Sequence, residues 1–139
     1  MSDSFELSTV LPALPARVYA AWLSSAEHAA MTGASARGIA GGSADIDPRV
    51  GGGYSAWDGY ITGTTLELEP DHRIVQAWRT VEFPADSPDS RLEIVLNAVN
   101  GGTRLTLKHS NLPAGQGASY ESGWVENYFE PMQNYSYEG

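Results

Sequence analysis

Alternating polar and apolar positions mark a strand over residues Thr103–His109. Successive side chains of a strand point to opposite faces of its sheet, so Leu105, Leu107 and His109 share one face. A loop of small residues is expected to follow from Ser110 to Ser119. The last predicted strand therefore has an apolar face that also carries a histidine.

A helix with large aromatic side chains is expected after this loop, from Gly123 onward. Trp124 and Tyr128 are four residues apart, a spacing that places both side chains on one helix face. Pro131 has no backbone N–H and clashes with the preceding turn, so we expect the helix to kink or end between Asn127 and Glu130. Such a helix, laid on the apolar face of a sheet, either closes a core or leaves a pocket.

Short strands, turns and two small helices are predicted for the rest of the chain. Pro15 suits the first turn of a helix, and a serine at position 24 or 25 caps a second one. Asn100–Gly102 predicts a tight turn, since these residues tolerate positive φ. The order of elements indicates an α+β domain with one curved antiparallel sheet. The expected ranges are strands at 5–11, 44–48, 50–54, 60–68, 72–81, 90–99 and 103–109, and helices at 16–23 and 24–31.

Composition narrows the class of protein. The 139 residues, 42% of them hydrophobic, predict a single domain over positions 1–139. No apolar run approaches the roughly 18 residues that a membrane helix needs, so no membrane partner is expected. Residues Met1–Glu6 are acidic and lack the apolar stretch of a secretory signal, and the chain has no cysteine for disulfides or thiolate chemistry. A soluble cytoplasmic protein is expected.

The charge pattern argues against nucleic-acid partners. The net charge is −9, and the eight basic residues are scattered, so they cannot neutralise a row of phosphates. His28, His72 and His109 lack the spacing of a metal-binding motif, and no Gly-Lys-Ser/Thr follows Gly51–Gly53. We therefore expect no nucleic acid, no metal and no cofactor. We interpret these glycines as part of a bulge or a turn, and Asp58 as a turn residue.

Nine motifs occur in an order and spacing typical of one known family. They are Leu14–Trp22, Gly51–Tyr54, Trp57–Tyr60, Gly63, Leu68–Pro70, Arg73–Arg79, Gly102–Leu107, His109–Ser110 and Gly123–Trp124. On this series the chain resembles the Hsp90-ATPase-activator-like (AHSA1-type) branch of the START-like, or SRPBCC, helix-grip superfamily over about residues 5–135. The resemblance implies an α+β fold: a curved antiparallel sheet of about seven strands around a long C-terminal helix, with two short helices after the first strand.

The resemblance also implies several classes of function. Members of the superfamily bind lipids, sterols, polyketides or plant hormones in a cavity between sheet and helix, and some catalyse cyclisation, dehydration or oxygenation. We therefore expect a small hydrophobic ligand in such a cavity. A cavity enzyme of cyclase or hydrolase type and an Hsp90-type chaperone-interaction module are the alternatives. The edge strand of the sheet leaves both a monomer and a homodimer open.

Twelve side chains are expected to face this cavity, and none of them forms a catalytic constellation. The aromatic ones either fill a core or line a pocket. His109 either bonds a ligand, acts as an acid or base, or bonds a backbone carbonyl, whereas His28 is expected on a helix surface and His72 in a turn. The twelve are Trp57, Tyr60, Gln76, Trp78, Leu92, Ile94, Leu96, Leu105, Leu107, His109, Trp124 and Tyr128.

Overall fold

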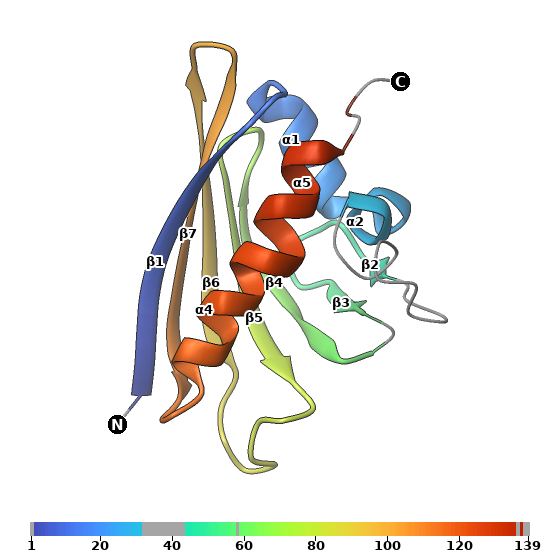
Figure 1. Ribbon diagram of the computed structural model, residues 1–139. Coiled ribbons are helices and arrows are strands. Elements are labelled where there is room, and N and C mark those ends of the chain that lie inside the picture. Colours follow the sequence, from blue (N-terminus) through green and yellow to red (C-terminus); the bar gives the residue numbers. More distant parts are fainter. Residues whose placement is uncertain (1, 32–43, 58, 136, 138–139) are drawn as a thin grey trace.

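A curved sheet of seven antiparallel strands wraps around a long C-terminal helix (Figure 1). The structure is a computed structural model that describes residues 2–31, 44–57, 59–135 and 137, so the expected turn residue Asp58 lies outside it. The strands are arranged in the order β1-β7-β6-β5-β4-β3-β2. Their bounds are β1 Ser2–Leu11, β2 Asp45–Ile46, β3 Gly53–Ala56, β4 Ile61–Glu69, β5 Arg73–Thr80, β6 Ser90–Val99 and β7 Gly102–Pro113.

The register of the central strands aligns the predicted inward side chains into rows. Leu92 on β6 pairs with Gln76 on β5 and with His109 on β7, and Ile94 pairs likewise with Ile74 and Leu107. All of these side chains are buried, because they share the face of the sheet that the long helix covers. Alternation along the strand thus correctly predicted the inner face.

Two short helices, α1 (Pro15–Leu23) and α2 (Ser25–Met31), follow the first strand. Pro15 occupies the first turn of α1. Ser24 separates the two helices, because its backbone is extended, with φ −90° and ψ 124°. Its hydroxyl accepts a hydrogen bond from the backbone N–H of Glu27 at 3.3 Å. Of the two serines that the sequence offered as a cap, Ser24 is therefore the one that caps α2.

The loop predicted from Ser110 to Ser119 is shorter in the structure, so both of its predicted ends are wrong. Strand β7 continues to Pro113, and the helix already begins at Gly117, with α4 spanning Gly117–Trp124. The strand is extended because it stays paired with β1 as far as the Ser2–Pro113 pair. The helix starts early because one Asp3 carboxylate oxygen accepts the backbone N–H groups of Gly115 and Gly117 at 3.0 and 2.9 Å. Both causes come from the other end of the chain.

Pro131 does not end the C-terminal helix. A π-helical turn, η1 (Val125–Phe129), follows α4, and α5 (Glu130–Asn134) continues the helix with Pro131 in its first turn. The backbone N–H of Glu130 bonds the carbonyl of Val125, five residues back. The irregularity predicted near Asn127 is therefore present as a wider turn, which accommodates the missing N–H of proline.

Candidate ligand pocket

A pocket of about 190 Å³ lies between the helical segment α4–η1 and one end of strands β3 to β5. An apolar cavity of about 150 Å³ is enough to hold benzene, whereas sites for drug-sized ligands measure roughly 300–1,000 Å³. The pocket therefore has the volume of a single substituted ring. Its lining residues are Trp57, Tyr60, Ile61 and Trp78 from the sheet side, and Ser119, Tyr120, Gly123, Trp124, Asn127 and Tyr128 from the helix.

The structure brings five of the twelve predicted residues to this pocket, and all five are aromatic: Trp57, Tyr60, Trp78, Trp124 and Tyr128. The apolar remainder fills the closed core beside it, where each side chain is at most 2% exposed: Leu92, Ile94, Leu96, Leu105 and Leu107. Gln76 and His109 point inward as predicted, but they do not line the pocket. Core and pocket are thus neighbouring parts of one aromatic and aliphatic interior.

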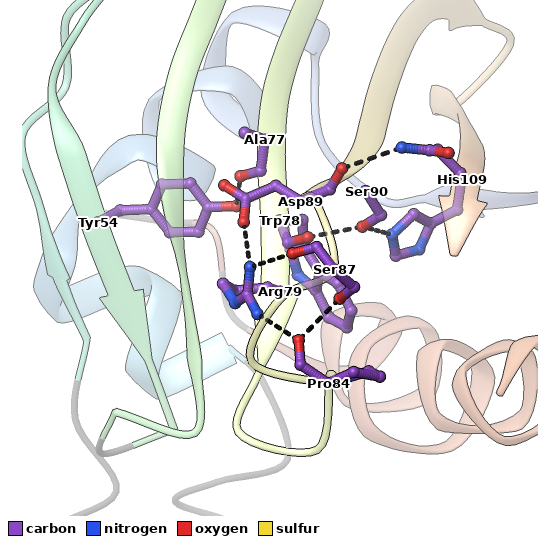
Figure 2. Close-up of polar contacts among 10 residues, drawn as sticks. Tyr54, Ala77, Trp78, Arg79, Pro84, Ser87, Asp89, Ser90 and His109 are labelled. Carbon is purple, nitrogen blue, oxygen red and sulfur yellow. Dashed lines mark hydrogen bonds and ion pairs between the residues drawn. The ribbon is translucent and has the colours of Figure 1, made fainter. Parts of the chain in front are cut away.

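His109 is held by two side chains of the interior. Trp124 Nε1 donates to His109 Nδ1 at 3.1 Å, which leaves Nε2 to carry the proton. Nε2 lies 2.8 Å from the Ser90 hydroxyl, which donates to the carbonyl oxygen of Trp78 at 2.7 Å (Figure 2). Burial lowers the pKa of His109 to about 3, so the ring is neutral at pH 7. Neither nitrogen is free for a ligand or a proton transfer.

His28 is buried, which corrects the expectation of a surface histidine on α2. Its Nδ1 bonds the backbone carbonyl of Trp22 and its Nε2 bonds the Tyr128 hydroxyl, both at 2.9 Å. Burial lowers the pKa of His28 to about 4, against the opposing effect of the Trp22 carbonyl. Helical periodicity did not predict this position, because its partner lies 100 residues further along the chain.

Gln76 is the inward polar residue that strand parity predicted, and its partners come from the protein. Trp22 Nε1 donates to its Oε1 at 3.4 Å, and its Nε2 donates to the Thr65 hydroxyl at 3.2 Å. Both neighbours are themselves buried. The amide therefore links α1 to strands β4 and β5.

Sequence reasoning missed five lining residues: Ile61, Ser119, Tyr120, Gly123 and Asn127. Ser119 lies at the end of the expected loop, but it belongs to α4, which begins at Gly117. Tyr120 precedes Trp124 by four residues, so helical spacing would have placed it on the pocket face had the helix start been known. Asn127 is on the π-helical turn, whose geometry has no simple signature in the sequence.

Two buried polar atoms among the lining residues have no hydrogen-bond partner: Trp57 Nε1 and Asn127 Oδ1. Trp57 Nε1 is near enough to the Tyr128 oxygen to oppose, in part, the rise in the pKa of Tyr128 that burial causes. It does not reach hydrogen-bond geometry with that oxygen. Leaving a buried polar group unpaired costs about 1–3 kcal/mol of folding free energy. Such a group in a native structure calls for an explanation, and a ligand in the pocket would provide one.

The three pocket tyrosines direct their hydroxyl protons away from the pocket. Tyr60 donates to the Glu82 carboxylate, and Tyr120 donates to Gln116 Oε1 at 2.9 Å. Tyr128 donates to His28, because Nδ1 of that ring already carries the proton that bonds the Trp22 carbonyl. Burial raises the pKa of all three phenols, so they are neutral at pH 7. The pocket thus receives no proton donor from these three phenols.

Within the described ranges, no three His, Asp or Glu side chains come together in a way that could hold a metal ion. Nor does any helix in them have the length and apolar character needed to cross a membrane.

The comparison with known proteins settles the family. Residues 12–136 match the model of the Activator of Hsp90 ATPase homolog 1-like protein family, AHSA1. The chain belongs to this family. The human Activator of 90 kDa heat shock protein ATPase homolog 1 is 27% identical to this AHSA1-type chain over 90 residues, which are 65% of the chain but only 26% of the human protein. The chain therefore spans about a quarter of that relative.

Solved structures agree on the fold of this AHSA1-type chain. An Hsp90 activator from Plasmodium falciparum superposes with a TM-score of 0.82 at 24% identity, and the alignment covers 94% of both chains. DynU16, a putative protein from the dynemicin biosynthetic locus, superposes with a TM-score of 0.75 at 17% identity over 96% of this chain and 46% of its own. Both likenesses are to the helix-grip fold, which confirms the architecture predicted from the motifs.

Proposed function

We propose that the protein binds a small, largely apolar ring compound in the aromatic pocket. The observation that carries this proposal is the coincidence of six aromatic side chains and two unpaired buried polar atoms around one space of about 190 Å³. Ligand sites typically combine apolar and aromatic walls with a few placed polar groups. A ligand that pairs these atoms would remove the cost of burying them alone.

The geometry gives less support to catalysis by the histidines of this interior. Both nitrogens of His109 and of His28 are already bonded inside the protein, and burial keeps both rings neutral. A general acid or base must be within reach of the proton that it transfers. Binding without chemistry is therefore the function that we propose.

Gly123→Leu tests the proposal by filling the pocket from the helix side. A Cβ at this position meets only Asn127 Nδ2, at 3.8 Å, so the added side chain has space in the pocket. Leucine also favours a helix over glycine by up to about 1 kcal/mol, so the variant should fold at least as well as the parent chain. We expect the NMR chemical-shift changes that a panel of single-ring compounds induces in the parent chain to disappear in this variant. Its melting temperature should stay the same or rise.

Ser122→Leu is the matched control, because Ser122 is an exposed neighbour on the same helix that does not line the pocket. It should retain every binding response of the parent chain. The proposal fails if no ring compound of the panel binds the parent chain, or if Gly123→Leu binds as well as Ser122→Leu.

Family membership favours a second candidate function, binding to an Hsp90-type chaperone in the cytoplasm. The human relative and the Plasmodium falciparum protein are both named as Hsp90 activators, and the latter aligns over 94% of both chains. The measurement is the ATPase rate of a purified Hsp90 with and without this protein. A rate that rises with protein concentration in both the parent chain and Gly123→Leu would support a chaperone role that is independent of the pocket.

A further inference from the structure

We infer that the aromatic pocket selects an organic cation, namely a single ring carrying a protonated, alkylated amine. This inference rests on the proposed function, because it specifies the chemistry of the ligand in the same pocket. It follows from what the described lining residues offer a ligand: aromatic rings, one unpaired acceptor and no basic side chain.

Indole and phenol side chains make up six of the ten described lining residues of the pocket. Trp57 stacks on Tyr128 with ring centroids 6.4 Å apart, and Tyr128 lies 4.5 Å from Trp124 at a tilt of 58°. Trp78 meets Tyr120 edge to face at 5.1 Å. The face of an aromatic ring is electronegative, and indole attracts cations most strongly. Walls of indole and phenol therefore favour a positive charge between them.

The hydroxyl groups strengthen this preference. Each pocket tyrosine donates its proton to an acceptor elsewhere in the protein, and for Tyr60 that acceptor is the carboxylate of Glu82. A phenol that donates to a carboxylate gains electron density, so its ring attracts a cation more strongly. Glu82 also places a negative charge at the hydroxyl group of Tyr60, a lining residue of the pocket.

Asn127 Oδ1 specifies where the ligand should donate a hydrogen bond. It is buried, it has no partner, and its residue lines the pocket. An acceptor in this position needs an N–H or O–H donor, and an ammonium N–H makes a stronger bond than a neutral donor. Trp57 Nε1 does not require a ligand acceptor to the same degree, because the Tyr128 oxygen is close to it.

The basic side chain of Arg79, which follows the lining residue Trp78 on β5, is bonded elsewhere in the protein. Arg79 donates to the Asp89 carboxylate at 2.8 Å and to the carbonyl oxygens of Ser87 and Pro84, both at 3.1 Å (Figure 2). Its guanidinium is 5.4 Å from the Phe83 ring, and it does not line the pocket. Among the described lining residues a carboxylate ligand would thus find no cation to pair with, whereas the net charge of −9 attracts a cationic one.

Three benzyl compounds of similar shape test the inference by isothermal titration calorimetry at pH 7. N,N-dimethylbenzylammonium carries a charge and one N–H, benzyltrimethylammonium carries a charge without an N–H, and isobutylbenzene is the neutral isostere of the first. We expect N,N-dimethylbenzylammonium to bind about tenfold more tightly than isobutylbenzene, and benzyltrimethylammonium to lie between the two.

Asn127→Leu distinguishes the contribution of the Asn127 acceptor to ligand affinity from that of the aromatic rings. It should weaken the binding of N,N-dimethylbenzylammonium to the level of benzyltrimethylammonium and leave the latter within about twofold of its parent affinity. Asn134→Leu is the matched control, since Asn134 is an exposed asparagine further along the same helix, and it should change neither affinity.

The outcomes distinguish this inference from the proposed function. If isobutylbenzene binds as tightly as either cation and Gly123→Leu abolishes that binding, the cation preference is refuted and the ring-binding pocket stands. If neither the cations nor the neutral compound binds the parent chain, both proposals are refuted.

Discussion

Two buried histidines show how partners distant in sequence determine the protonation state of a single residue. His109 accepts a hydrogen bond from Trp124 and His28 accepts one from Tyr128, so in each ring a fixed nitrogen is kept unprotonated. A second proton on either ring would displace one of these aromatic partners. Both residues consequently tie the C-terminal helix to the rest of the interior through a neutral imidazole.

Acidification should therefore destabilise the fold before the carboxylates titrate. The pKa of His28 is about 4 and that of His109 about 3, both below the ordinary value of 6.5, so the unfolded state takes up these protons first. The free energy of unfolding should be unaffected by these groups above pH 6.5 and fall below it. Near pH 5 the loss should approach about 1.4 kcal/mol per pH unit for each histidine. Urea unfolding at half-unit steps from pH 7.5 to 4.5 measures this slope.

A His109→Gln variant provides the control for this pH dependence. It should be less stable at pH 7, because the Trp124 and Ser90 contacts are altered, but its slope between pH 6.5 and 5 should be about half that of the parent chain. An unchanged slope would mean that His109 is not among the groups responsible.

At the scale of elements, the strand β7 and the helix that follows it are connected by a very short turn. The Asp3 carboxylate on β1 bonds the backbone N–H groups on both sides of the helix start. Negative charge at this position also interacts favourably with the helix dipole. The N-terminal strand thus determines where the C-terminal helix begins.

Asp3→Ala should remove this cap and lower the free energy of unfolding by about 1 kcal/mol. Amide hydrogen exchange at Gly115 and Gly117 should accelerate more than at residues in the middle of the helix, because these two N–H groups lose their acceptor. Glu6→Ala, an exposed acid on the same strand, serves as the control. Equal effects of the two substitutions on exchange would contradict the capping role.

The elements that the sequence predicted well are those with local causes. The range Ser90–Val99 and the two short helices matched the structure closely, since alternation, Pro15 and the Ser24 cap act within a few residues. The end of β7 and the start of α4 were missed because β1 and Asp3 decide them from the opposite end of the chain. The lining residues Ser119 and Tyr120 were missed for the same reason, since both lie in the first turns of α4.

At the scale of the whole molecule, one arginine joins the two short helices to the C-terminal segment. Arg17 on α1 pairs with Glu27 on α2, and its Nε donates to the backbone carbonyl of Tyr137 at 2.6 Å. The Tyr135 hydroxyl donates to the same Glu27 carboxylate at 3.0 Å. Tyr135 and Tyr137 are thereby held against α1 and α2.

Arg17→Ala should lower the free energy of unfolding more than the loss of an exposed arginine does, because it removes charged hydrogen bonds to two segments at once. Arg49→Ala removes an arginine whose side chain is 80% exposed and bonds only the nearby Asp47, so it should cost at most a few tenths of a kcal/mol. Chemical denaturation of both variants provides the comparison. A similar loss in the two would show that the Arg17 contacts do not stabilise the fold.

The aromatic interior has a spectroscopic consequence. All four tryptophans of the chain, Trp22, Trp57, Trp78 and Trp124, belong to one set of ring contacts, in which Trp124 lies 6.2 Å from Trp22 and 5.7 Å from Trp78. Trp57 joins this set through Tyr128. Excitation energy passes readily between rings this close, so the emission of the folded chain originates from the walls and surroundings of the pocket. Its native fluorescence should therefore respond to an occupant without any label.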